Sequence, residues 1–164
     1  GIWINRFDAD FAALRVVLKR LQNGEVLAVA PEGTRSPTES LLPGHPGAAY
    51  LAAKSGLPII PIGIVGTEDR VVKHRLKRLQ RLDITARVGA PYHVPPMPKV
   101  NRDAWLAEQT DEIMCQIAAL LPPDHRGVYA DHPRLHALLL ERGSPFPEDQ
   151  ALGIAAPREA TALG

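Results

Sequence analysis

Two arginines near the start of the chain are the side chains best suited to hold an anion. Arg6 ends an alternating apolar run, and Arg35 lies in a polar turn directly after the apolar segment 25–30. Ligands of open parallel sheets bind beyond the carboxyl ends of the strands, so parallel strands would bring both guanidinium groups to one rim. A guanidinium presents a planar fork that matches phosphate oxygens. The pattern therefore predicts a site for a phosphate monoester.

The turn around Arg35 offers further polar groups for such a site. The hydroxyls of Thr34 and Ser36 and the backbone N–H of Gly33 can donate hydrogen bonds to a phosphate. Glu32 can hold an arginine or accept a hydrogen bond from a substrate hydroxyl. The alternative interpretation is structural, because a Glu-Gly-Thr-Arg turn can also be a strand exit with a surface salt bridge. The turn alone does not choose between the two.

These residues need a sheet to position them, and the hydropathy pattern predicts one. Apolar strands are expected at 2–6, 25–30 and 57–65. A helix from Asp8 or Asp10 to Asn23-Gly24 and a second helix at 47–55, ending at Gly56, separate these strands. Strands that alternate with helices predict right-handed crossovers. The expected fold class is α/β, with a mostly parallel sheet flanked by helices.

Beyond the third strand the pattern predicts helices, one edge strand and loops. The expected elements are a basic helix at 70–81, an edge strand at 83–89, a proline-rich connector at 91–98, a long helix capped by Asn101 and closed by Pro122-Pro123, and a short helix at 133–142. Residues 143–164 lack apolar periodicity. We therefore expect one domain over residues 1–142, followed by a disordered tail at 143–164.

Composition narrows the possible functions. The 164 residues are 45% apolar, enough for the core of one domain, and the net charge of +1 gives no general reason to bind nucleic acid. Cys115 is the one cysteine, so no internal disulfide can form, and its place beside an apolar stripe predicts a core residue. The longest apolar run, 57–65, is far shorter than the ~20 residues that cross a bilayer. No membrane-spanning segment is expected in this chain.

Four sequence blocks resemble the glycerophospholipid acyltransferases, the lysophosphatidate acyltransferases in particular. They are Gly1-Ile2-Trp3-Ile4-Asn5-Arg6, Pro31-Glu32-Gly33-Thr34-Arg35-Ser36, Gly47-Ala48-Ala49-Tyr50-Leu51-Ala52 and Leu57-Pro58-Ile59-Ile60-Pro61-Ile62-Gly63-Ile64. The blocks follow the family order over residues 1 to about 66. The resemblance implies a glycerol-3-phosphate acyltransferase-like fold. It also implies that Arg6 and the five residues 32–36 form the phosphate site and that Pro61 lies on the acyl-donor side.

One motif of that family is missing from this chain. Family members carry a His-x4-Asp motif before the Arg6 block, in which the histidine is the general base on the acceptor hydroxyl. None of the six histidines is followed at that spacing by aspartate, and the nearest approach is the pair His136 and Glu141. We therefore interpret Gly1 as an internal cut and expect the fold to be incomplete at the N-terminus, with residues 1–142 as the C-terminal portion of the acyltransferase domain. We also expect the chain alone to be inactive.

The resemblance implies acyl transfer from a thioester to a lysophospholipid hydroxyl in phospholipid biosynthesis. The expected acceptor is a lipid such as 1-acylglycerol-3-phosphate, and the donor is acyl-CoA or acyl carrier protein. A thioester carbonyl is already activated, so no metal or other cofactor is expected. The alternative is a noncatalytic phospholipid-binding or peripheral membrane module that keeps the phosphate site without the dyad.

The segment 70–87 concentrates positive charge. It holds seven basic residues and one acidic residue, Asp83, with interleaved apolar residues. Such a helix can lie on an anionic membrane through Lys73, Arg75, Lys77 and Arg78, which predicts a peripheral protein at the cytoplasmic face. A solvated helix packed on the sheet is the alternative. Nucleic acid is not an expected partner, because the segment has no interleaved aromatic residues.

Overall fold

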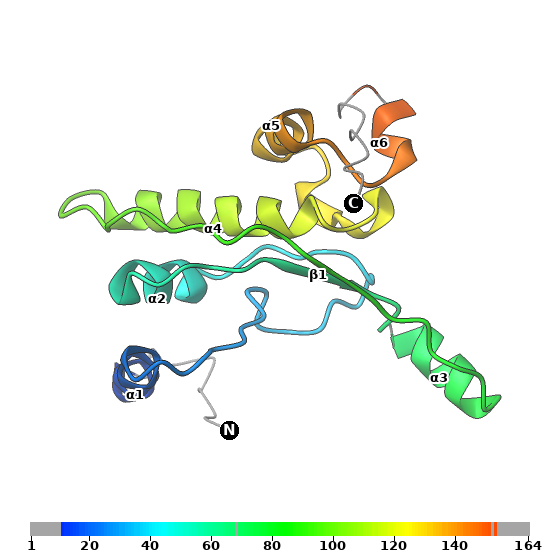
Figure 1. Cartoon of the computed structure of the whole chain (residues 1–164), viewed down its shortest axis with the longest axis horizontal. Coiled ribbons are helices and arrows are strands. Elements are labelled where there is room, and N and C mark those ends of the chain that lie inside the picture. Colours follow the sequence, from blue (N-terminus) through cyan, green and yellow to red (C-terminus); the bar gives the residue numbers. More distant parts are fainter. Residues whose placement is uncertain (1–10, 68, 152, 154–164) are drawn as a thin grey trace, which may run out of the picture. The chain divides into compact units, whose positions relative to one another are not determined.

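The computed structural model describes residues 11–67, 69–151 and 153 (Figure 1). The chain divides into two compact units, which we treat separately. Unit 1 comprises Gly1–Arg35, Pro43–Ile59 and Pro91–Asp111, and unit 2 comprises Ser36–Leu42, Ile60–Ala90 and Glu112–Gly164. The predicted strand at 2–6, and with it Arg6, lies outside the described residues, as do both proposed helix caps, Asp8 and Asp10.

Unit 1 contains the first two predicted helices. Helix α1 (Phe11–Gln22) ends just before the Asn23-Gly24 turn, and α2 (Gly47–Ser55) ends at Gly56. Gly56 has the left-handed φ of 67° that favours glycine, and its N–H donates to the Ala52 carbonyl. The two helices contact each other, and Val17 and Leu51 are buried. Both helix predictions are confirmed.

The predicted strand at 25–30 is absent. These residues have no regular structure and are exposed, with Val26 96% accessible. An apolar run becomes a strand only where a neighbour satisfies its backbone N–H and C=O groups. No described strand pairs with this segment, and the N–H of Glu25 instead donates to the Arg20 carbonyl in the turn after α1. The apolar composition was thus misleading about local structure.

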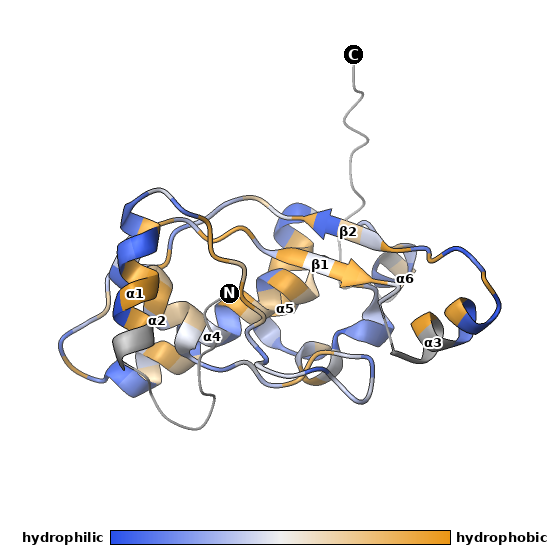
Figure 2. Cartoon of the chain, turned by 90° about the horizontal axis from the view of Figure 1, so that it is seen from below, coloured by the Kyte–Doolittle hydropathy of each residue, from blue (hydrophilic) through white to orange (hydrophobic). Residues whose placement is uncertain are grey.

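Unit 2 contains a two-stranded antiparallel sheet instead of the expected, mostly parallel one. Strand β1 (Ile62–Val65) pairs with β2 (Thr85–Val88), Ile62 lying opposite Val88 (Figure 2). Strand β1 is the last part of the run predicted at 57–65, and β2 confirms the edge strand predicted at 83–89. The parallel arrangement needed strands at 2–6 and 25–30. The first lies outside the described residues and the second forms no ladder.

One face of this sheet packs closely on the residues that follow helix α4 (Arg102–Ala118). A Cβ atom added at Gly63 would lie 2.9 Å from the Cβ of Leu120, closer than carbon atoms approach in folded proteins. Gly63 is buried, whereas its neighbours Ile62 and Ile64 on the other face are about half exposed. Glycine therefore lets the backbone of β1 approach this segment where a larger residue would not fit.

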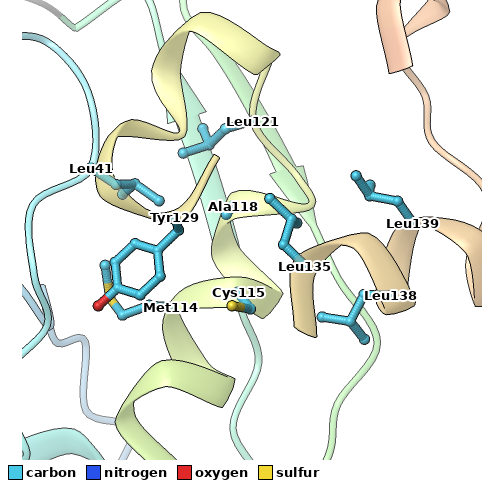
Figure 3. Packing of buried hydrophobic residues seen from close by; sticks show 9 residues of the cluster. All are labelled: Leu41, Met114, Cys115, Ala118, Leu121, Tyr129, Leu135, Leu138 and Leu139. Atoms are coloured by element: carbon cyan, nitrogen blue, oxygen red, sulfur yellow. The ribbon is translucent and has the colours of Figure 1, made fainter. Parts of the chain in front are cut away.

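The core of unit 2 forms between the last turns of α4 and helix α5 (Pro133–Arg142), as Figure 3 shows. It contains Leu41, Met114, Cys115, Ala118, Leu121, Tyr129, Leu135, Leu138 and Leu139. Cys115 is fully buried, which confirms its prediction as a core residue. Helix α5 matches the helix predicted at 133–142. In the described part of the chain, no helix is both long and apolar enough to cross a membrane.

The segment 143–151 differs from the predicted disordered tail. Helix α6 (Pro147–Ala151) follows Phe146, and both Phe146 and Asp149 are buried. The guanidinium of Arg126 donates two hydrogen bonds of 2.6 and 2.5 Å to the Asp149 carboxylate, which also accepts from the Ser144 hydroxyl. Polar residues here are ordered because a buried ion pair holds them, which hydropathy alone does not reveal. The boundary at residue 142 stays a prediction.

Candidate functional site

The predicted phosphate motif begins in a tight turn of unit 1. The Gly33 N–H donates to the Ala30 carbonyl over 3.0 Å, which closes the turn. Pro31 and Gly33 occupy its second and fourth positions, where proline and glycine are favoured. Gly33 has a positive φ of 64°, which suits glycine because it has no Cβ. The local sequence therefore accounts for the turn without help from distant residues.

The turn leaves the candidate ligand-binding side chains accessible. Thr34 and Arg35 are exposed, and Glu32 is half-buried. The Gly33 N–H is already bonded within the turn, so a phosphate would have to share it with the Ala30 carbonyl, and its donor role stays a prediction. The convergence of Arg6 with Arg35 stays a prediction, since Arg6 lies outside the described residues.

Ser36, the last residue of the motif, belongs to a short series of hydroxyl groups in unit 2. Its Oγ lies 3.0 Å from Thr38 Oγ1, which in turn lies 3.0 Å from Ser40 Oγ. The Thr38 N–H also donates to Ser36 Oγ over 3.3 Å. Ser36 therefore already has local partners, and a phosphate would have to share its hydroxyl with Thr38.

His45 is a neighbour of the turn that the sequence motifs did not indicate. Its backbone N–H donates to the Pro31 carbonyl over 2.8 Å. A Cβ atom added at Gly33 would lie 3.2 Å from Cδ2 of the His45 ring and 3.7 Å from Nε2, so the ring lies against the Gly33 backbone. Tyr50, not aspartate, follows His45 at the spacing of the family dyad, so that motif did not indicate it. The available signal was the turn-forming sequence Pro43-Gly44-His45-Pro46-Gly47 soon after the motif.

Pro61, predicted on the acyl-donor side, is buried next to β1. Its carbonyl accepts a hydrogen bond of 2.9 Å from the Gly89 N–H just beyond β2. The contact extends the pairing of the two strands by one step. It gives Pro61 a structural role in the sheet, and its role toward a donor stays a prediction.

The basic helix predicted at 70–81 is α3 (Asp69–Lys77), which ends four residues earlier than predicted. Of its predicted membrane contacts, Arg75 is engaged within the protein, because its guanidinium donates to the Arg81 carbonyl over 2.8 Å and to the Asp83 carboxylate. Lys77 and Arg78 are exposed, and nothing is described of the Lys73 side chain. The basic surface is therefore better defined by Lys77, Arg78 and Arg81 than by Arg75.

Exposed leucines accompany this charge. Leu76 is 67% accessible and Leu79 is 94% accessible, the latter in a left-handed turn with φ of 51° directly after α3. Figure 2 shows hydrophobic and hydrophilic residues together on α3. A surface that exposes leucines among cations combines the two features of a helix that binds at a membrane interface.

The described residues include no group of three or more His, Cys, Asp or Glu side chains that could hold a metal ion. They also include no histidine followed by aspartate at the spacing of the family dyad, and only His136 is followed there by a glutamate. The pair His136 and Glu141 lies within α5, where the His136 Nε2 is 3.1 Å from the Ala130 carbonyl. The role of Arg35 in binding a phosphate stays a prediction.

Comparison with known proteins finds similarity to one class of protein. Residues 1–65 match the family model described as Acyltransferase, in agreement with the resemblance that the sequence motifs indicated. It is 32% identical to a 1-acyl-sn-glycerol-3-phosphate acyltransferase of Cocos nucifera over 80% of this chain and 36% of that protein. A protein of the same name from Limnanthes alba is 31% identical over 64% of this chain and 33% of its own length.

A bacterial relative matches a shorter region. The 1-acyl-sn-glycerol-3-phosphate acyltransferase of Salmonella typhimurium is 46% identical over 46 residues, which are 28% of this chain and 19% of that protein. No solved structure matches the chain. The chain spans about a third of the length of the plant relatives that it matches. The resemblance to lysophosphatidate acyltransferases is confirmed, and the activity of the whole protein is a proposal.

Proposed function

We propose that this chain binds the phosphorylated acceptor in an acyl transfer from a thioester to a lysophospholipid hydroxyl. The observation that supports it best is the exposed Arg35 in a tight turn within the segment that matches the acyltransferase family. The relatives are named for 1-acyl-sn-glycerol-3-phosphate, which carries a phosphate monoester. An exposed guanidinium with the Thr34 hydroxyl beside it suits that group.

In the proposed reaction, the acceptor hydroxyl attacks the carbonyl carbon of the acyl thioester. A general base takes the hydroxyl proton, the carbon–sulfur bond breaks, and the thiol of CoA or acyl carrier protein leaves. Arg35 and Thr34 hold the phosphate so that the hydroxyl meets the thioester in one orientation. Pro61 is assigned to the donor side by resemblance alone. No metal or other cofactor has a role in this scheme.

The same proposal extends to the fold of residues 1–142. There, residues 2–6 would be a strand of a mostly parallel sheet flanked by helices. Residues 25–30 form no strand, but Val26, Leu27 and Val29 are exposed and are of the kind that a neighbouring element buries. Arg6 and Arg35 would then meet at one rim.

The 164-residue chain alone is expected to show no acyl transfer above background. It contains no His-x4-Asp sequence, and a general base contributes about 10² to 10⁴-fold to such a rate. The measurement is transfer of a labelled acyl group from acyl-CoA to 1-acylglycerol-3-phosphate by the purified chain. Acylation that increases in proportion to the amount of chain would contradict the proposed role of the missing dyad.

The second candidate function is a noncatalytic phospholipid-binding module. The lack of a His-x4-Asp sequence favours it, while the phosphate turn fits both candidates. The same assay on the complete gene product, the natural protein that contains this chain, separates them. Turnover there supports the enzyme, and phosphate-dependent lipid binding without turnover supports the module.

We also propose that the protein works peripherally, at the cytoplasmic face of a membrane. Its proposed acceptor is a lipid, and α3 with the turn after it exposes leucines among basic side chains. Each such cation near an anionic membrane surface contributes about 1 kcal/mol to the free energy of membrane binding. Leu76 and Leu79 would enter the headgroup region, while Lys77, Arg78 and Arg81 pair with lipid phosphates.

Replacing Lys77, Arg78 and Arg81 by glutamine is expected to weaken binding to anionic vesicles by roughly a hundredfold at low salt, the combined effect of about 1 kcal/mol from each cation. The loss should shrink at high salt, where charges are screened within ~3 Å at 1 M. Vesicle co-sedimentation measures it. A control with Arg15, Lys19 and Lys99 replaced by glutamine has the same net charge and should bind almost normally. Equal loss in both variants would contradict a specific surface at α3.

A further inference from the structure

The imidazole of His45 lies against Gly33, in the middle of the predicted phosphate motif. The hydrogen bond from the His45 N–H to the Pro31 carbonyl brings this residue back to the start of the motif. Its ring lies against Gly33, with Cδ2 3.2 Å and Nε2 3.7 Å from the position of a Cβ atom there. Any larger residue at 33 would press against the ring, so the glycine leaves the space that His45 occupies.

The His45 ring is exposed, and it has no other role in the described structure. Within the described part of the chain, no hydrogen bond or ion pair involves the ring nitrogens. An imidazole carries at least one N–H donor in either protonation state. The nearby backbone donor, the Gly33 N–H, is already used by the Ala30 carbonyl. His45 thus offers the turn an available donor where its own backbone provides none at Gly33.

We propose that His45 is a binding residue for the acceptor phosphate and acts together with Arg35. The inference rests on the proposed function and adds a group that the family motifs do not assign. A phosphate at the turn would accept a hydrogen bond from the imidazole. A hydrogen bond to a charged partner of this kind is expected to raise the affinity about tenfold or more. Discrimination between phosphorylated and neutral acceptors then depends on both residues.

The direct test uses the 164-residue chain and glycerol 3-phosphate as the probe, followed by NMR of the histidine ring protons. The His45 resonances are expected to shift as the probe is added, and those of His93, an exposed histidine of unit 1, to stay in place. Glycerol, which lacks the phosphate, should cause no shift. Arg35→Ala should abolish the response at His45. Unchanged His45 resonances at saturating probe would overturn the proposal.

A second test uses the acceptor KM of the complete gene product. His45→Phe keeps a ring to pack on Gly33 but has no N–H donor, so it is expected to raise the KM for 1-acylglycerol-3-phosphate about tenfold. The KM for acyl-CoA should be unchanged, and His93→Phe should behave like the wild type. Normal kinetics in His45→Phe would mean that the ring only packs against the turn.

The two tests separate this inference from the function on which it rests. If Arg35→Ala weakens binding of the phosphorylated acceptor and His45→Phe does not, the proposed function stands and the proposed role of His45 is wrong. If the gene product transfers no acyl group but glycerol 3-phosphate still shifts the His45 ring, the phosphate site stands and the proposed reaction is wrong.

Discussion

Replacing Arg35 by alanine in the complete gene product should raise the KM for 1-acylglycerol-3-phosphate roughly ten- to a hundredfold. Arg35 is exposed in the phosphate turn, and removing one partner of a charge-assisted contact costs about 1.5 to 3 kcal/mol. The KM for the acyl donor should change little. Arg35→Lys keeps the charge but loses the two-pronged geometry, so its effect should be smaller. Steady-state kinetics with each substrate varied in turn measure both values.

Monoacylglycerol, which has no phosphate, is the control acceptor. The wild type should prefer the phosphorylated acceptor, and the Arg35 variants should lose that preference. Arg6→Ala should behave alike if both arginines hold one phosphate, and the double variant should be less than additive. An equal loss of activity toward both acceptors, together with a lower Tm, would instead support the structural interpretation. In that case Glu32 and Arg35 only stabilise the turn.

Replacing Arg126 by methionine should destabilise the chain by about 3 to 5 kcal/mol. Arg126 is 1% accessible and Asp149 is fully buried, so the change leaves a buried carboxylate without its cation. Arg126 Nε also donates to the carbonyls of Ala118 and Leu121, which would lose that partner. Urea unfolding of the 164-residue chain, followed by circular dichroism, measures the loss in free energy of unfolding.

The double variant Arg126→Met, Asp149→Leu is the matched control. It removes both charges, and replacing a whole buried ion pair by apolar residues is often neutral. It should therefore regain much of the lost stability. Arg134→Gln affects a pair with Glu112 that is partly exposed, and it should cost less than Arg126→Met. A loss below about 1 kcal/mol for Arg126→Met would contradict the role of the pair.

The pH dependence of stability gives an independent readout of this pair. Burial alone would raise the pKa of Asp149, but the hydrogen bonds from Arg126 and Ser144 outweigh it and hold the pKa below its usual value. The stability from this group is therefore present above the unfolded pKa of about 3.9 and is lost as the pH falls through the folded pKa. That contribution to acid destabilisation should be missing from the double variant, in which residue 149 is leucine.

The helices were predictable because their signals are local. Apolar spacing followed by Asn23-Gly24 or Gly56 marks where α1 and α2 end, and the structure ends them there. The strand predicted at 25–30 failed because a strand depends on a partner that local sequence does not specify. The prediction of disorder was wrong at Asp149 for the same reason, since its partner Arg126 lies far away in sequence.

The phosphate turn was predictable in position but not in all its contacts. Proline and glycine at its favoured positions produced the tight turn, and Arg35 is exposed, while its role toward a phosphate stays a prediction. The folded backbone decides which hydrogen-bond donors are available. The Gly33 N–H is already bonded to the Ala30 carbonyl, and the His45 ring lies beside Gly33. On α3, charge alone did not reveal that Arg75 is held by Asp83.

The hydrogen bond from the His45 N–H to the Pro31 carbonyl joins the two ends of the loop 31–45, which contains Arg35. A loop whose ends are joined samples fewer conformations than an open segment of the same length. The conformational entropy of the loop is therefore lost when the protein folds, so ligand binding does not have to order the loop again. A phosphorylated lipid should meet a site that needs little rearrangement, so the rate of its capture is set by encounter and orientation.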